Sequence, residues 1–360
     1  MDDVHALRVL LGSPRVAPRH LDICVYHGHC NKQDRFDIES NKVINISCGN
    51  DFMFIEKQSL GKICLIGLGA NWKREISRDS ELSHFSKEVP ILEKTTAFCC
   101  SPADSFLALE NNIVVNNLGT MRLQLPRKVI RIAAGTSHVL ILCEDRSVYG
   151  VGSNSNGQLG LFIPDKNKLV QNAGDESDKL HHEPLFLQHD IDSVVAAYDQ
   201  SYFIVGSRVY SPCNSENHIF SRSVLKVVCG RHHSLALVEG DEVNQLYGWG
   251  DNARGAVGVS SCLKPRGAKL SKPQLINSRL SSFQHKVDKI IQIAAGEYFS
   301  IVALDDGTAF MWGSINRKEM ILGPKLMSGL KHVEGLYAGP SYAVFVHDSR
   351  KQALLKIRKR

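Results

Sequence analysis

One unit of sequence recurs along this chain, and a recurring unit limits the fold more than any isolated motif does. The clearest copy spans Val129–Gly160. In it an apolar run ends on Ala-Ala-Gly, and a second apolar run follows. An acidic turn, a third short run and a loop rich in Gly and Asn complete the unit. The same order returns at Val224–Gly258 and at Ile290–Arg317, so the agreement indicates a true repeat.

Four weaker copies align on the corner, the small residue that ends the first apolar run. Two of them keep its glycine, in the segments that begin at Val43 and at Gly335, and the other two carry Ser101 and Tyr198 there. The seven aligned corners are residues 49, 101, 135, 198, 230, 296 and 339. Their average spacing of about 48 residues is close to the blade period of β-propellers, roughly 40 to 50 residues.

The apolar runs are short, rich in β-branched and aromatic residues, and bounded by Gly, Asn, Asp and Ser, which is typical of β-strands. No apolar pattern of helical period is long enough to supply crossover helices. Meandering strands in a recurring unit favour radial sheets around a channel. The sequence therefore predicts an all-β fold, a seven-bladed β-propeller.

The two ends of the chain must meet for such a ring to close. The last unit has its first two strands but no clear third strand after His347, whereas Leu21–Asp34 resembles a third strand with no unit before it. We therefore predict that the N-terminal strand Ile23–Tyr26 joins the C-terminal blade. The alternative is that Gln352–Ile357 supplies the missing strand. The expected organisation is an irregular segment 1–20, one propeller domain over 21–348 and a basic tail 349–360.

Composition sets limits on function. The chain has 360 residues, 43% of them hydrophobic and 22% charged, which is typical of a globular protein and far from disorder. The net charge of +6 is mild and leaves nucleic acid as a weak candidate partner. No secretory signal and no apolar run long enough to span a bilayer are apparent. We therefore expect free thiols for the ten cysteines, and an intracellular protein of the cytoplasm or nucleus.

The units resemble a known repeat. The segments LYGWGDNARGAVG and VYGVGSNSNGQLG, each preceded by a glycine corner and a histidine, look like the repeat of the regulator-of-chromosome-condensation family. Gly-Gln-Leu-Gly at 157–160 is the most specific part of the match. The resemblance covers roughly Ile23 to Asp348. It implies guanine-nucleotide exchange on a small nuclear GTPase with chromatin binding on the opposite face, or, as in many relatives, a scaffold that binds protein partners.

The resemblance also implies a binding face built from polar residues just after each corner. Carried over by position, the candidates are Asp51, Ser137, His138, Asp199, Arg231, His232, His233 and Glu297. The alternative is that these side chains only satisfy backbone groups at tight turns. Two insertions, Phe162–Pro184 and Ser260–Lys286, are further candidates, because long loops on a rigid scaffold often carry binding function. The second insertion contains a basic loop with Lys264, Arg266, Lys269 and Lys272.

No motif for enzymatic chemistry is present. Gly67-Leu68-Gly69 lacks the third glycine and the helix of a dinucleotide-binding loop, and no Gly-x-Ser-x-Gly elbow occurs. The histidines and cysteines lack the spacing of zinc ligands, so we expect no metal and no cofactor. The predicted function is a non-enzymatic, monomeric, protein-binding scaffold or adaptor. The alternatives are a guanine-nucleotide exchange factor and, more weakly, a chromatin-associated adaptor.

Overall fold

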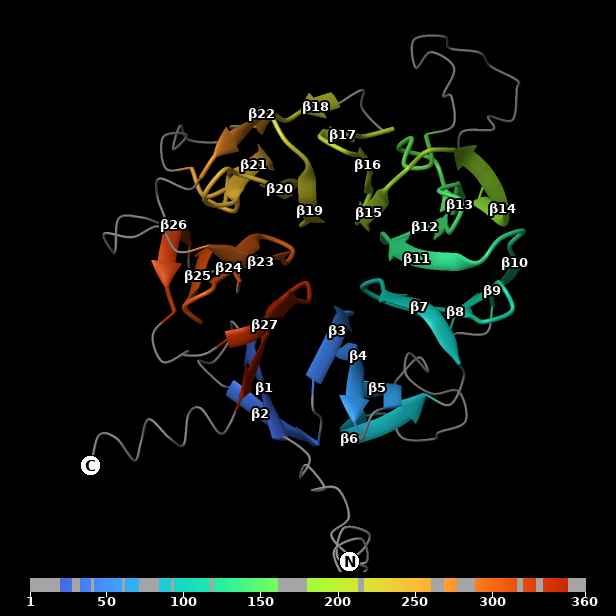
Figure 1. Ribbon diagram of the computed structural model, residues 1–360, viewed down its shortest axis with the longest axis horizontal. Helices are drawn as coiled ribbons and strands as arrows, with labels where there is room; N and C mark the ends of the chain where they lie inside the picture. The colour runs from blue at the N-terminus through green and yellow to red at the C-terminus, as the bar shows by residue number, and fades with distance from the viewer. Residues whose placement is uncertain are drawn as a thin grey trace, which may run out of the picture.

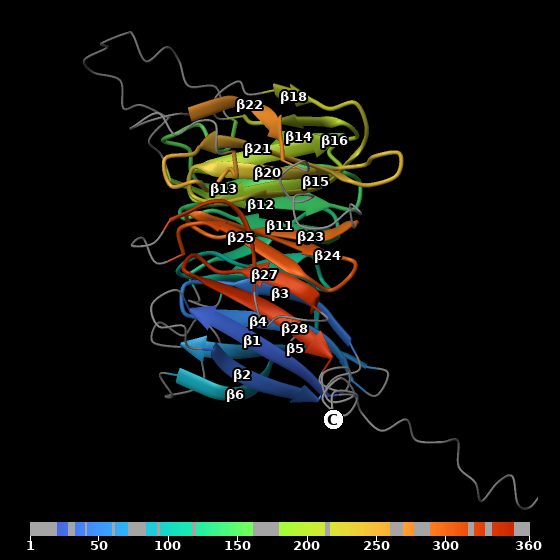
Figure 2. The ribbon, with the colours of Figure 1, turned by 90° about the vertical axis from the view of Figure 1, so that its left-hand side faces the viewer.

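The computed structural model describes residues 20–27, 33–39, 42–59, 62–70, 84–91, 94–116, 120–160, 180–212, 217–259, 269–276, 289–315, 320–327 and 333–348. Every element in these ranges is a β-strand. The strands form seven antiparallel sheets of four strands each. Figure 1 shows the sheets arranged as a ring around a central axis, and Figure 2 shows the same ring edge-on. The all-β propeller architecture predicted from the repeat is confirmed.

Six sheets follow the chain in simple order from the inner strand outward. The first three sheets are β3 (Lys42–Cys48), β4 (Phe52–Ser59), β5 (Lys62–Ala70), β6 (His84–Ile91); β7 (Thr95–Cys100), β8 (Ser105–Leu109), β9 (Ile113–Asn116), β10 (Arg122–Gln124); and β11 (Val129–Ala134), β12 (His138–Cys143), β13 (Val148–Ser153), β14 (Leu180–Gln188). The next three are β15 (Ser193–Ala197), β16 (Gln200–Val205), β17 (Arg208–Tyr210), β18 (Asn217–Ile219); β19 (Val224–Cys229), β20 (His233–Val238), β21 (Gln245–Asp251), β22 (Lys269–Leu275); and β23 (Ile290–Ala295), β24 (Phe299–Leu304), β25 (Ala309–Gly313), β26 (Ile321–Leu326).

The seventh sheet is built from both ends of the chain. Its inner strands are β27 (Val333–Ala338) and β28 (Tyr342–Asp348), and its outer strands are β1 (His20–His27) and β2 (Gln33–Glu39). β1 pairs with β28, with Ile23 opposite Val346 and Tyr26 opposite Ala343. The prediction that the N-terminal strand completes the C-terminal blade is confirmed, and the alternative strand Gln352–Ile357 lies outside the described residues. This pairing closes the ring by backbone hydrogen bonds.

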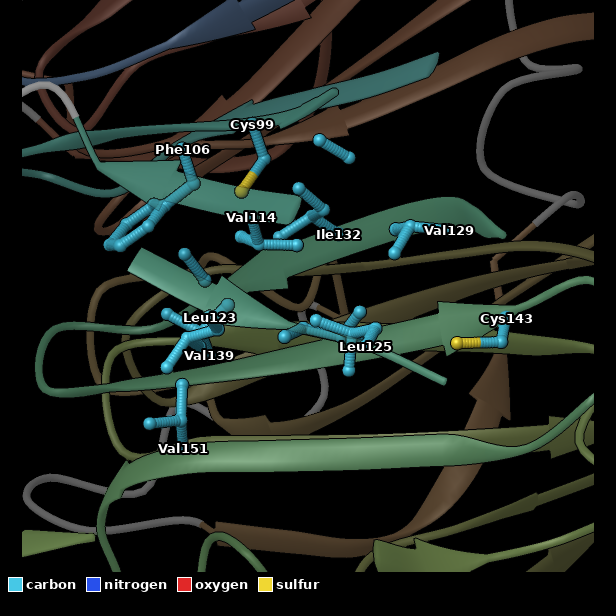
Figure 3. Close-up of a cluster of buried hydrophobic side chains, with 13 residues drawn as sticks. Cys99, Phe106, Val114, Leu123, Leu125, Val129, Ile132, Val139, Cys143 and Val151 are labelled. Carbon is cyan, nitrogen blue, oxygen red and sulfur yellow. The ribbon is translucent and has the colours of Figure 1, made fainter. Parts of the chain in front are cut away.

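The hydrophobic core lies between neighbouring sheets. Figure 3 shows the cluster where Cys99, Phe106 and Val114 of one sheet meet Ile132 and Val139 of the next. An equivalent cluster joins the first sheet to the last through Ile46, Met53, Tyr342 and Val344, among others. Because each sheet is covered on both faces, the second strands β12, β20 and β24 are buried along their whole length. This is why their sequences are nearly continuous apolar runs and do not alternate with polar residues.

Candidate partner-binding face

Each sheet turns from its inner strand to its second strand through a four-residue corner. In the fifth sheet the backbone N–H of Gly230 donates to the carbonyl of His233 at 2.9 Å. In the second sheet the backbone N–H of Ser101 donates to the carbonyl of Asp104 at 2.8 Å in the same way. Because the seven inner strands all run in the same direction, the corners gather at one end of the channel. We call this end the corner face.

The corner glycines are required by the ring that follows them. In five corners the third residue after the glycine carries a ring, and a Cβ on the glycine would meet that ring at 2.0–2.3 Å. The pairs are Gly49 with Phe52, Gly135 with His138, Gly230 with His233, Gly296 with Phe299, and Gly339 with Tyr342. The second corner has Asp104 at the ring position, so Ser101 fits there. None of these five glycines has a φ in the left-handed region, so backbone conformation does not require glycine there. Glycine is required because any Cβ would collide with the ring.

The corner of the fourth sheet is Ala197, and the prediction of Tyr198 was wrong by one residue. Corners are joined by backbone hydrogen bonds to the residue that follows the next corner, as from Arg231 to the carbonyl of Glu297 at 3.0 Å. Thr136 donates in this way to the carbonyl of Tyr198 at 2.8 Å, which makes Ala197 equivalent to the glycine. Ala197 pairs with Gln200, which has no ring. Because Gln200 has no ring, the corner position does not need glycine and can be Ala197. The unit therefore lacks the glycine on which most of the other corners were aligned.

Two of the predicted surface residues are buried. His138 and His233 are each 2% exposed, and each shares a hydrogen bond with a serine of the next sheet. The distances are 2.8 Å from His138 Nε2 to Ser201 Oγ and 2.9 Å from His233 Nε2 to Ser300 Oγ. Burial lowers the pKa of both imidazoles to about 4. These histidines join neighbouring sheets and cannot form part of an exposed binding face.

Four other candidates are exposed on the corner face, and all four occupy the second place after a corner. They are Asp51, Ser137, Asp199 and His232. Their spacing follows the repeat, so they come from four different sheets. Together they give the corner face a polar rim that contains two acidic residues.

Arg231 and Glu297 lie at the first place after their corners and are paired. Arg231 Nη1 lies 2.7 Å from Glu297 Oε1, and the Glu297 side chain is only 12% exposed. The hydrogen bond to Glu297 is the main reason why the pKa of Arg231 is raised. The Arg231 guanidinium also lies 5.7 Å from the ring centroid of Tyr198. The ion pair thus links the corners of the fifth and sixth sheets, and the contact with Tyr198 links both to the corner of the fourth sheet.

A second arginine extends this group. The guanidinium of Arg254 lies 4.4 Å from the ring centroid of Tyr298, which follows Glu297 in the sixth corner. We call Tyr198, Arg231, Arg254, Glu297 and Tyr298 the corner belt. Tyr198 has a φ of 49°, an uncommon conformation for an aromatic residue. Strained residues of this kind concentrate at functional sites.

Sequence reasoning missed three members of the corner belt. In the sequence Tyr198 stands where a corner glycine is expected, Tyr298 is one residue beyond the candidate Glu297, and Arg254 lies in a loop of the repeat. The ring of Phe299 places Tyr298 at the second position after its corner, whereas Gln200 carries no ring and gives no such alignment for Tyr198. No signal in the sequence pairs Arg254 with a corner, because that contact joins two sheets.

The basic loop is only partly a loop. Lys269 and Lys272 lie on β22, the outer strand of the fifth sheet, and both are exposed. Lys264 and Arg266 lie outside the described residues, as does most of the first insertion, whose end Leu180–Pro184 belongs to β14. The two placed lysines sit at the rim of the disc, away from the corners.

The described residues offer little for other chemistry. No group of three or more His, Cys, Asp or Glu side chains among them is placed to hold a metal ion. In the same part of the chain no helix is long and apolar enough to cross a membrane. The described cysteines, Cys48, Cys64, Cys99, Cys100, Cys143 and Cys229, are all free thiols.

Radial four-stranded sheets, a channel and a recurring glycine corner define a β-propeller assembled from sequence repeats. The model of the regulator of chromosome condensation (RCC1) repeat matches residues 129–158, 224–256 and 290–318, and a second model of the same repeat matches 244–303. The chain therefore contains RCC1 repeats and is similar to the RCC1-type propellers.

Known relatives are distant. The chain is 23% identical over 278 residues to the RCC1-like G exchanging factor-like protein of Mus musculus, a match that covers 76% of this chain and 44% of the mouse protein. It spans about half or less of the curated relatives it matches.

Solved structures agree on the fold. Prp20p of Saccharomyces cerevisiae superposes with a TM-score of 0.67 at 15% identity and covers 96% of each chain. Human WBSCR16 superposes with a TM-score of 0.66 at 14% identity, over 92% of this chain and 99% of the other. At these identities the comparison supports the architecture alone.

Proposed function

We propose that this protein is a non-enzymatic propeller that binds a protein partner through its corner face, as a scaffold or regulatory adaptor. The observation that carries the proposal is the corner belt, which brings two arginines and two tyrosines from adjacent sheets to one end of a rigid ring. Tyr and Arg are the residues most often found at the energetic centres of protein interfaces. The polar rim of Asp51, Ser137, Asp199 and His232 would surround that centre.

Removal of the aromatic side chains of the corner belt should weaken partner capture strongly. We expect Tyr198→Asn with Tyr298→Ser to weaken binding about 30-fold, because truncation of aromatic residues at such centres costs about 2 kcal/mol or more. Asn tolerates the φ of Tyr198, so the backbone should be unchanged. The measurement is quantitative affinity capture from a cell extract, with the recovered protein identified by mass spectrometry.

Lys269→Ala with Lys272→Ala provides the matched control, since these exposed lysines lie on an outer strand. This control should capture the same partner as the wild type. Loss of capture in the lysine control, with retention in the tyrosine variant, would assign binding to the basic segment. Salt dependence would then test the chromatin alternative, because phosphate contacts weaken steeply as salt rises.

Guanine-nucleotide exchange is the second candidate function. It is favoured by the mouse relative named as a G exchanging factor-like protein, and by Prp20p, whose structure was described with its binding to Gsp1p and histones. The test is release of a fluorescent guanine nucleotide from a small nuclear GTPase. We expect no acceleration at micromolar protein, and acceleration that is lost in Arg231→Ala would replace the adaptor proposal.

We also place the protein inside the cell, in the cytoplasm or nucleus. The support is the free state of all the described cysteines, which fits a reducing compartment. Microscopy of a fluorescent fusion tests this location.

A further inference from the structure

The end of the channel opposite the corner face has its own repeated feature. In six of the seven described sheets the inner strand carries one extra residue near its start, where the pairing with the second strand shifts register. A bulge of this kind leaves one residue outside the ladder and turns its side chain away from it. The six extra residues are Ile44, Thr96, Ile130, Leu225, Ile291 and Glu334.

Four of these bulge residues are exposed aliphatic side chains. Ile44 is 39% exposed, Ile130 47%, Leu225 51% and Ile291 44%. A single exposed aliphatic residue needs no explanation. The same exposed position in four sheets sets an interrupted apolar rim around one mouth of the channel, with Thr96 and Glu334 at the equivalent positions of two other sheets.

Positive charge lies one residue deeper in the channel. Arg131 and Lys226 directly follow the bulge residues Ile130 and Leu225, and both line the central cavity, whose volume is about 600 Å³. Arg131 donates to the Ser193 hydroxyl at 3.0 Å. The Lys226 ammonium makes no hydrogen bond or ion pair with any residue in the described part of the chain. Burial, and then the charge of Arg131, lower the pKa of Lys226 to about 8.

The acids that line the same cavity do not neutralise these two cations. Asp192 lies 2.8 Å from Arg146, and Glu297 is bound by Arg231. Glu56 lies on β4 of the first sheet, and burial raises the pKa of its carboxyl. Lys226 is half-buried and its ammonium has no partner, which is costly for a cation, and an incoming anion would relieve that cost.

We propose that this mouth binds an acidic and aliphatic peptide segment of a partner protein. A carboxylate of the segment enters between Arg131 and Lys226, and its aliphatic neighbours pack on the apolar rim. Charge complementarity inside the channel and apolar surface at its edge together specify this occupant over a purely polar one. The mouth lies at the far end of the inner strands from the corner face, so failure of this proposal would leave the corner-face proposal intact.

The test uses the full chain and a short fluorescent peptide in which leucine alternates with aspartate, read by fluorescence anisotropy. We expect saturable binding that is weakened at least about tenfold by Arg131→Gln with Lys226→Gln. Ile130→Ser with Leu225→Ser should weaken it similarly, whereas Arg231→Ala on the corner face should not. A peptide with asparagine in place of aspartate, or serine in place of leucine, should bind poorly.

A second measurement needs no variant. The lowered pKa should make Lys226 react readily with acetic anhydride near neutral pH, and the acidic peptide should protect it while the asparagine peptide does not. Absence of saturable binding, equal binding of the asparagine peptide, or unprotected Lys226 would overturn the proposal. Equal competition by a single-stranded oligonucleotide would also overturn it, in favour of a general polyanion site.

Discussion

Gly230→Ala should destabilise the protein by about 3 kcal/mol or more, at the upper end of the usual cost of overpacking. A Cβ at this position would lie 2.2 Å from the His233 ring and 2.4 Å from the carbonyl oxygen of Gly296 in the next sheet. His233 is buried and the second contact is backbone, so neither group can move away cheaply. Equilibrium unfolding in urea, followed by fluorescence, measures the change.

The fourth sheet supplies the matched control. Ala197 occupies the equivalent corner with Gln200 at the ring position, so Ala197→Gly removes a tolerated Cβ. We expect this change to cost no more than about 1 kcal/mol, the usual penalty of added backbone freedom. If Gly230→Ala and Ala197→Gly lowered the free energy of unfolding by equal amounts, the ring at the third position after the corner would not be the reason for glycine at the corner.

Acidification from pH 6.5 to pH 4 should destabilise the protein through His138 and His233. In the unfolded chain these imidazoles take up a proton near pH 6.5, whereas burial lowers their pKa in the folded protein to about 4. Between these values the unfolded state binds more protons, so the free energy of unfolding falls as the pH falls. Their contribution is complete above pH 6.5, and each histidine loses about 3 kcal/mol of it by pH 4.

His138→Gln and His233→Gln should flatten this pH dependence, because glutamine does not titrate. Glu56, whose pKa is raised, changes stability in the opposite direction, so the difference between wild type and variant isolates each histidine. The check is urea unfolding at a series of pH values. Identical slopes in wild type and His233→Gln would contradict the assignment.

Local sequence patterns predicted much of the fold. The apolar runs of the second strands, such as β12, were visible because burial on both faces leaves no polar position in them. The closing strand was predictable because the last unit lacks a third strand after His347, whereas Leu21–Asp34 resembles a third strand that has no unit before it. One segment supplies what the other lacks. The prediction of the fourth corner was wrong because Gln200 carries no ring, so the fold does not require glycine at Ala197.

The candidate site was less predictable. Position after the corner correctly marked Asp51 and His232 as exposed, but the same rule also selected His138 and His233. The third residue after a corner points into the contact between sheets, and a histidine suits that contact as well as it suits a surface. The contact of Arg254 with Tyr298 depends on how two sheets meet, and no local pattern contains that information.

The sequence by itself determined the repeat, the strand order within each sheet and the closure of the ring, since these follow from short-range patterns of apolar and turn residues. Only the tertiary structure decided which corner side chains face solvent, which arginine and tyrosine side chains meet, and that Arg131 and Lys226 share one channel. The physical reason is that each of these groups combines residues from several different sheets. Their chemistry exists only when sheets distant in the chain are brought around one axis.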